Sequence, residues 1–167
     1  MPNKIIYTNT QLRGDLQEIL RQMTLDAFMP DIIVGIARGG LVPATMLSHY
    51  LGKPLEVINY SLRDRKVSQA SEINDVALKI KAKKKVLLVD DICDGGDTLR
   101  NVVDQLDEIL CHLDNADEYD CSNELKSAVL WNNIGQDLFE PNYAGREINR
   151  SEDDSWVIFP YEEWWKA

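Results

Sequence analysis

Short apolar runs alternate along this chain with stretches in which apolar residues recur at helical spacing. The clearest example is the apolar run 86–89, which predicts a buried strand and is followed by a helical stripe over residues 99–113. The same order occurs earlier, where the run 32–36 precedes a predicted helix over residues 41–51 that ends at Gly52. Because crossover connections join strands that alternate with helices, the pattern predicts an α/β fold, with a central parallel sheet flanked by helices.

Other segments extend this pattern. The further predicted elements are an edge strand at residues 4–7, a helix over residues 12–27 capped by Thr8 or Thr10, and strands at 55–58 and 128–131. The polar segment 61–84 has no strong periodicity, although residues 70–80 are compatible with a helix or a hairpin. A long irregular segment inside a compact domain is more often functional or mobile than idle, so we expect this one to serve the site.

The length of the chain indicates one domain, which we expect to span residues 1–167. A chain of 167 residues can bury roughly 70% of its unfolded surface and so sustain its own core. No apolar run approaches the ~20 residues of a membrane span, and the first ten residues lack the apolar region of a signal peptide. The three cysteines form no C-x-x-C pair. We therefore expect a cytoplasmic protein that does not associate with membranes.

The charge of the chain is strongly negative but unevenly distributed. The sequence has 28 acidic and 18 basic residues, a net charge of −10, which argues against nucleic acids and anionic membrane surfaces as partners. Residues 104–124 hold eight carboxylates and no lysine or arginine, whereas the rest of the chain is nearly neutral. We expect the acidic segment to be a solvated helix face and loop. The charge balance therefore does not exclude a small anionic ligand elsewhere.

The segment after the apolar run 86–89 carries the strongest functional signal. Asp90 and Asp91 end the predicted strand, and a turn containing Asp94, Gly95 and Gly96 leads into the next helix. Ligands of parallel α/β sheets bind at the carboxyl ends of strands, and glycines allow backbone amides to approach a ligand closely. The following helix N-terminus favours a phosphate, and two carboxylates suit ligand hydroxyls or a divalent cation.

A purely structural interpretation of this segment is that Asp97 or Thr98 caps the helix and that the glycines shape the turn. This is reasonable for each residue alone, but it does not account for the combination of strand, acid pair, third acid and Gly-Gly turn. The segment is also not a Walker A loop, because the Gly-Lys-Ser/Thr element is missing. A ligand-binding turn is therefore the favoured interpretation.

Two more segments strengthen the signal. The apolar run 33–36 leads into Ala37-Arg38-Gly39-Gly40, and residues 156–162 have the sequence Trp-Val-Ile-Phe-Pro-Tyr-Glu. Together with residues 86–98 they resemble the motifs of the type I phosphoribosyltransferases, most closely the xanthine–guanine and hypoxanthine–guanine enzymes. In that family's signature a threonine is usual where this chain has Gly95. The resemblance implies the type I phosphoribosyltransferase fold, with a core of about residues 1–132 and a small C-terminal, base-binding hood of about residues 133–167.

The resemblance also implies a reaction and its partners. The family transfers ribose 5-phosphate from phosphoribosyl pyrophosphate to a nucleobase, with Mg2+ as cofactor. Asp90 and Asp91 would bind the ribose hydroxyls, directly or through the metal and its water. The amides of Gly95, Gly96 and Asp97, with Thr98, would hold the 5-phosphate. The loop Arg38-Gly39-Gly40 would receive the pyrophosphate.

Other roles implied by the resemblance concern the base. Asp94 would accept or return a proton at N7 of a purine, Trp156 would stack on its ring, and backbone groups of Val157 would bind its edge. Purine enzymes have a lysine after the strand that corresponds to residues 128–131; here no lysine is present, and Asn133 would hydrogen-bond the base as donor or acceptor. The segment that contains Arg63, Arg65 and Lys66 corresponds to the family's flexible catalytic loop. Self-association is expected from the family as well.

Three functional hypotheses remain at this point. The first is a magnesium-dependent purine phosphoribosyltransferase that acts in purine salvage. The second is a regulator that keeps the fold and senses phosphoribosyl pyrophosphate or a nucleotide without catalysis. The third is a phosphoribosyltransferase for a pyrimidine base, which Asp94 and the aromatic segment 156–165 disfavour.

Overall fold

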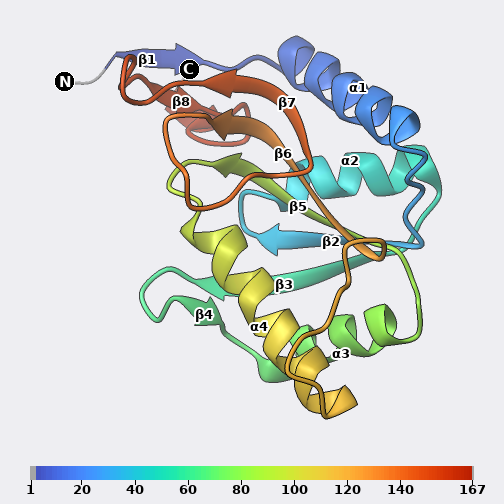
Figure 1. The fold of residues 1–167 in the computed structure, drawn as a ribbon. Helices are drawn as coiled ribbons and strands as arrows, with labels where there is room; N and C mark the ends of the chain where they lie inside the picture. The colour runs from blue at the N-terminus through green and yellow to red at the C-terminus, as the bar shows by residue number, and fades with distance from the viewer. Residues whose placement is uncertain (1–2, 167) are drawn as a thin grey trace.

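A computed structural model describes residues 3–166 of the chain. A six-stranded sheet with the order β4-β3-β2-β5-β6-β7 forms its centre (Figure 1). The strands are β2 (Ile32–Ala37), β3 (Leu55–Ser61), β4 (Lys66–Val67), β5 (Val86–Cys93), β6 (Leu125–Asn133) and β7 (Tyr143–Ile148). Neighbouring strands are parallel except β3 and β4, which form an antiparallel hairpin. The predicted α/β fold with a central, mostly parallel sheet is confirmed.

Four helices cover the two faces of this sheet (Figure 1). They are α1 (Asn9–Leu25), α2 (Leu41–Leu51), α3 (Ala70–Lys81) and α4 (Asp97–Asp114). On β5, Val86 and Leu88 belong to the apolar cluster of α3 and α4, whereas Leu87 and Val89 belong to the cluster of α1 and α2. Successive side chains of a strand point to opposite faces, so a strand covered on both faces must be apolar throughout. This is the physical reason for the uninterrupted apolar run.

A second, two-stranded sheet forms a hood next to the main sheet. In it β1 (Lys4–Ile6) pairs in parallel with β8 (Trp156–Ile158), and the 3-10 helix η1 (Trp164–Lys166) follows. We call β1, β8 and residues 159–166 the hood. Its buried side chains Val157 and Phe159, together with Tyr7 immediately after β1, extend the apolar cluster of α1 and α2.

The boundary expected near residue 133 does not coincide with the boundary between the two sheets. Strand β7 lies beyond that boundary, yet it pairs with β6 and forms the edge of the main sheet, with Tyr143 and Ile148 buried. The hood in turn takes one of its two strands, β1, from the beginning of the chain. The difference arises because pairing between β6 and β7 covers an edge that β6 would otherwise expose.

The other predicted elements agree with the structure. Thr8 caps α1 in a capping box with Gln11, and Gly52 ends α2 with a left-handed φ of 62°. Segment 61–84 contains α3, whose buried residues form one apolar face. Strand β7 was not predicted, because its interior residues are only partly buried and show no alternation. Within residues 3–166, no helix has the length and apolar character needed to cross a membrane.

Candidate active site

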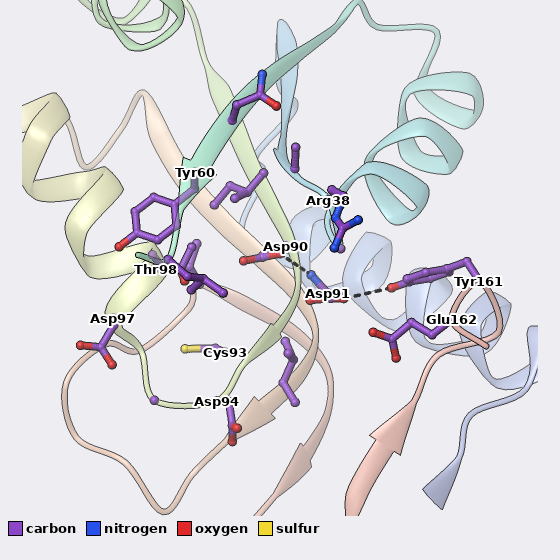
Figure 2. Close-up of a pocket in the computed structure, with 18 of the residues that line it drawn as sticks. Arg38, Tyr60, Asp90, Asp91, Cys93, Asp94, Asp97, Thr98, Tyr161 and Glu162 are labelled. Atoms are coloured by element: carbon purple, nitrogen blue, oxygen red, sulfur yellow. Dashed lines mark hydrogen bonds between the residues drawn. The ribbon is translucent and has the colours of Figure 1, made fainter. Parts of the chain in front are cut away.

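A cavity of about 1160 Å3 opens at the carboxyl ends of β2, β3 and β5 (Figure 2). Parallel strands end at the same edge of a sheet, so loops far apart in sequence meet there. The sheet side of the cavity is lined by residues 36–39, 59, 60, 62, 68 and 90–99, and the hood side by Trp156, Ile158, Tyr161, Glu162, Glu163 and Trp165. The cavity thus brings together residues from all three segments that the sequence singled out.

The turn between β5 and α4 forms one end of the cavity. Gly96 is the N-cap of α4 and has a φ of 81°, which favours glycine, and a Cβ there would lie 2.8 Å from Gln136 Oε1. Since Gly96 has no side chain, the cap provides no side-chain acceptor for the first amides of the helix. The turn therefore differs from the capping interpretation, in which Asp97 or Thr98 would be the cap. Amides at a helix start without such an acceptor suit an anion.

The loop between β2 and α2 forms the neighbouring wall. Arg38 and Gly39 line the cavity, and the peptide bond between Ala37 and Arg38 is cis. A Cβ added at Gly39 would overlap the carboxylate of Asp91, and one at Gly40 would overlap the carbonyl oxygen of Val89. The glycines are therefore required for this loop to lie directly against the end of β5. This close approach places the guanidinium-bearing loop beside the two acids (Figure 2).

Asp90 and Asp91, here called the acid pair, lie near the end of β5, which continues to Cys93, and both line the cavity (Figure 2). Asp90 is only 8% exposed, and its Oδ1 accepts a hydrogen bond of 2.9 Å from the amide of Asp91. Burial and the neighbouring Asp91 charge raise the pKa of Asp90 well above its ordinary value. Burial, with the charge of Glu162, raises the pKa of Asp91 to about 6.

The acid pair lacks a basic partner among the described residues, since no salt bridge within residues 3–166 includes either carboxylate. Tyr161 of the hood donates a hydrogen bond of 3.4 Å to Asp91 Oδ2. Buried carboxylates without a counter-charge attract a cation, and carboxylate oxygens are the ligands that Mg2+ prefers. No group of three or more His, Cys, Asp or Glu in this part of the chain is arranged as a complete metal site. The acid pair therefore fits a cation that takes its remaining ligands from water and substrate.

Asp94 lies further along the turn, apart from the acid pair (Figure 2). Its carboxylate accepts a hydrogen bond of 3.0 Å from Nε of Arg150, and its backbone carbonyl accepts one of 2.8 Å from Asn133 Nδ2. Asn133 is buried and also accepts bonds from the amides of Gly135 and Arg150. The structure thus places Asn133 behind the turn, outside the cavity lining.

The hood contributes the aromatic side of the cavity. Trp156 lines the cavity and is 56% exposed, as a residue that stacks on a ligand requires. Val157 is buried and pairs with Ile5 of β1, so its side chain does not line the cavity. The amide of Trp156 donates to the Asn3 carbonyl, and the carbonyl of Ile158 accepts from Tyr7. Because backbone groups alternate in direction along a strand, those of Val157 point to the opposite, open edge of β8.

The predicted flexible segment is the tip of the hairpin between β3 and β4. Arg63 and Arg65 are exposed in its turn, and Lys66 pairs with Ser61. None of these three basic residues lines the cavity, whereas their neighbours Tyr60 and Leu62 do. The base of the hairpin is held by bonds from Asn59 to Glu72 and from Asn101 to Tyr60, which leaves the basic tip beyond these anchors.

Several residues in or beside the cavity had no predicted role in ligand binding. Tyr161 and Glu162 belong to the segment 156–162, but nothing in their spacing indicates that they face Asp91. Arg150 had no sequence signal at all, since it lies in a segment of irregular polar residues. Cys93 lines the cavity, and burial raises the pKa of its thiol to about 12, in keeping with a packing role.

Comparisons with known proteins agree with this geometry. A family model described as a phosphoribosyl transferase domain matches residues 3–163. The hypoxanthine-guanine phosphoribosyltransferase of Saccharomyces cerevisiae is 25% identical over 170 residues, covering 81% of this chain and 76% of that protein. A crystal structure of a purine phosphoribosyltransferase from Pyrococcus horikoshii is 28% identical, with a TM-score of 0.65 and coverage of 96% of this chain and 95% of that chain. The Helicobacter pylori xanthine-guanine-hypoxanthine phosphoribosyltransferase is 22% identical, with a TM-score of 0.74 over 99% of this chain and 97% of that one, a likeness of fold.

Proposed function

The chain belongs to the type I phosphoribosyltransferases, and from this premise we propose that its acceptor is a purine base. The reaction would transfer the 5-phosphoribosyl group from phosphoribosyl pyrophosphate to the base and give a nucleoside monophosphate and pyrophosphate. One observation carries the proposal: a single cavity is lined by four groups. They are the β5–α4 turn at residues 94–98 (the anion-binding turn), the acid pair, the loop that contains Arg38 and Gly39 (the arginine loop), and the exposed Trp156. Each of these groups suits one part of the two substrates.

The donor would lie along the sheet side of the cavity. The amides of residues 95–98, with the Thr98 hydroxyl, would bind the 5-phosphate at the start of α4. The acid pair would accept hydrogen bonds from the two ribose hydroxyls. Arg38 and the amides of Gly39 and Gly40 would bind the pyrophosphate, on which negative charge grows as the glycosidic bond breaks.

The fit of Mg2+ rests on the acid pair. Asp90 and Asp91 would hold the cation, directly or through water, and so offset their mutual repulsion. When bound, Mg2+ neutralises and orients the departing pyrophosphate. Four more carboxylates line the cavity, at Asp94, Asp97, Glu162 and Glu163, while Arg38 is the one basic residue of the described lining. An anionic donor therefore needs a cation to enter this site.

The acid pair also suits the transition state. As the bond to pyrophosphate lengthens, the ribose ring gains oxocarbenium-like positive charge. Buried carboxylates that are fixed at the end of a strand stabilise such charge without reorganisation at the moment of reaction. The same carboxylates contribute less to the neutral ribose of the bound donor, so their effect is larger on the rate than on binding.

The base would lie between Asp94 and the hood. Trp156 offers a large planar face for stacking, and the open edge of β8 presents the backbone groups of Val157 to the edge of the base. The Asp94 carboxylate would accept the proton at N7 or return it. Asn133 uses its amide within the protein, so we propose that it acts on the base indirectly, by holding Asp94.

A panel of nucleobases tests the proposal. The protein is incubated with phosphoribosyl pyrophosphate, Mg2+ and one base at a time, from adenine through hypoxanthine, guanine and xanthine to uracil and orotate, and pyrophosphate release is measured. We expect turnover with at least one purine and none with the pyrimidines. Tight binding of the donor without product from any base would instead indicate a non-catalytic sensor, and turnover with a pyrimidine alone would contradict the purine assignment.

A further inference from the structure

Arg150 lies directly behind Asp94, between the β5–α4 turn and the hood. Its Nε donates a hydrogen bond of 3.0 Å to Asp94 Oδ1, and its Nη1 donates to the carbonyl oxygen of Ser155. The Arg150 side chain is 18% exposed, whereas that of Asp94 is 49% exposed. Asp94 lines the cavity and Arg150 does not, so the carboxylate faces the ligand space and the guanidinium supports it from behind.

A second set of contacts ties the same residues through their backbone. The Asn133 side chain donates to the Asp94 carbonyl at 2.8 Å and accepts from the Arg150 amide at 3.0 Å. Asp94 is therefore held at its carbonyl by Asn133 and at one carboxylate oxygen by Arg150. Oδ2 remains available to a ligand.

The Arg150 contacts also connect Asp94 with the aromatic wall. Ser155 is buried and immediately precedes Trp156, the first residue of β8. One guanidinium thus binds both the carboxylate on one side of the base space and the backbone that precedes the stacking residue on the other. The planar fork of arginine can make both bonds at fixed angles, which a lysine ammonium cannot do.

We propose that Arg150 is a positioning residue for base transfer, which fixes the Asp94 carboxylate in register with Trp156. The inference deepens the proposed function and rests on it. An exposed aspartate on a glycine-containing turn samples several rotamers, and each one lost on binding costs free energy. The hydrogen bond from Arg150 restricts the Asp94 side chain before the base binds, so this cost is not incurred on binding. The hydrogen bonds of Arg150 run to Asp94, Asn133 and Ser155, and none of them runs to the other residues of the proposed donor site.

The test compares three variants with the unaltered enzyme: Arg150→Gln, Arg150→Lys and Arg21→Gln. Arg21 makes a two-point ion pair with Glu18 on α1, outside the cavity lining, and serves as the matched control. For each, kcat and KM are measured separately for the base that the panel identifies and for phosphoribosyl pyrophosphate. Circular dichroism and thermal melting confirm that each variant folds.

We expect Arg150→Gln to lower kcat/KM for the base by about 10- to 100-fold, as outer-shell substitutions commonly do. KM for phosphoribosyl pyrophosphate should change less than about twofold, because Arg150 does not reach the donor site. Arg150→Lys keeps the charge but not the fork, so it should recover part of the loss. Arg21→Gln should match the unaltered enzyme.

A double-mutant cycle with Asp94→Asn separates positioning from a merely structural role. If Arg150 acts through Asp94, the double variant should be no worse than Asp94→Asn alone. Additive losses, or an unchanged kcat/KM for the base in Arg150→Gln, would overturn the inference while leaving the proposed function intact. Should Arg150→Gln fail to fold, Arg150→Lys in the Asp94→Asn background supplies the same comparison. Absence of turnover with every purine in the unaltered enzyme would overturn both.

Discussion

Two regions of this molecule are rich in carboxylates, but the carboxylates of the two regions differ in burial and in their basic partners. In the cavity the acid pair lies near the end of a central strand, where Asp90 is buried and Asp91 is half-buried. Residues 104–124 comprise the second half of α4 and the loop after it. Most of their carboxylates are exposed, as expected from the sequence. Several of them have basic partners, in the pairs Arg100–Asp104, Lys81–Asp114 and Lys83–Glu124.

The difference shows that the environment of an acid, not the local density of acids, indicates function. The acidic segment takes Lys81 and Lys83 from the end of α3 and the loop after it, although the segment contains no lysine or arginine itself. The acid pair takes no basic partner from the described chain and shows raised pKa values, Asp91 to about 6. Acids with raised pKa values and no basic partner cluster at functional sites of proteins. Three measurements address this contrast and a fourth extends it to the hood; they follow from the largest expected effect to the smallest.

The strongest contrast comes from neutralising two adjacent acids in each region. Asp90→Asn with Asp91→Asn should lower kcat/KM by about 100- to 1,000-fold, because under the proposed function it removes preorganised negative charge beside the ribose. Asp117→Asn with Glu118→Gln, an adjacent and exposed pair, should leave the kinetics unchanged. Steady-state assays with pyrophosphate readout measure both. Equal activity of the two double variants would show that the acid pair has no role in transfer.

The pH dependence of stability should separate the same two variants. Because the pKa of Asp91 is raised in the folded state, the folded protein binds protons more tightly than the unfolded chain between about pH 4 and pH 6. The contribution of Asp91 to the free energy of unfolding thus falls as pH rises through this window, by on the order of 3 kcal/mol. Urea denaturation should show Asp90→Asn with Asp91→Asn gaining stability over the unaltered protein from pH 4 to pH 7.5. The Asp117 and Glu118 variant should show no such gain, and parallel curves for all three proteins would contradict the raised pKa.

A third comparison contrasts two tryptophans of the hood. Trp156 lines the cavity, whereas Trp164 is 72% exposed and does not. Trp156→Ala should weaken base binding by about 1–3 kcal/mol, a rise of about 5- to 150-fold in KM for the base, if the ring stacks. Trp164→Ala should leave that KM unchanged. A similar KM in both variants would mean that Trp156 contributes to packing only.

The smallest effect is expected at the surface. Lys81 Nζ lies 2.6 Å from Asp114 Oδ1, and both side chains are more than one third exposed. Lys81→Gln should lower the free energy of unfolding by less than about 1 kcal/mol, because solvent screens such pairs. Thermal melting measures the change, and activity should stay constant. A loss of several kcal/mol, or a loss of activity, would mean that the acidic segment is more than a solvated face.

Features built from contiguous residues could be predicted from the sequence, whereas contacts between residues far apart in the sequence could not. The β5–α4 turn could be predicted because the apolar run, the acid pair and the glycines are contiguous, and each has a direct physical meaning. Gly39 could be predicted as part of a loop. Its close approach to Asp91 could not, because Gly39 follows β2 and Asp91 lies in β5, far apart in the sequence. Strand β7 was missed because partial burial leaves it without alternation.

The base side of the cavity was the least predictable. Asn133 was expected at the base, just after the predicted strand 128–131, and in the structure it is the last residue of β6. Its hydrogen bonds run to Asp94, Gly135 and Arg150, which no spacing rule could indicate. Arg150 is 56 positions from Asp94 in the sequence, so their ion pair becomes visible only in three dimensions.

The pairing of β1 with β8 has a consequence for how the protein is made. Lys4 lies opposite Trp156, so the hood joins a segment near the start of the chain to one that leaves the ribosome much later. The strands that carry the anion-binding turn and the arginine loop, β5 and β2, can pair well before that moment. The cavity wall formed by β2 and β5 can therefore be in place before the hood, and β1 lacks its partner strand until residues 156–158 have been made.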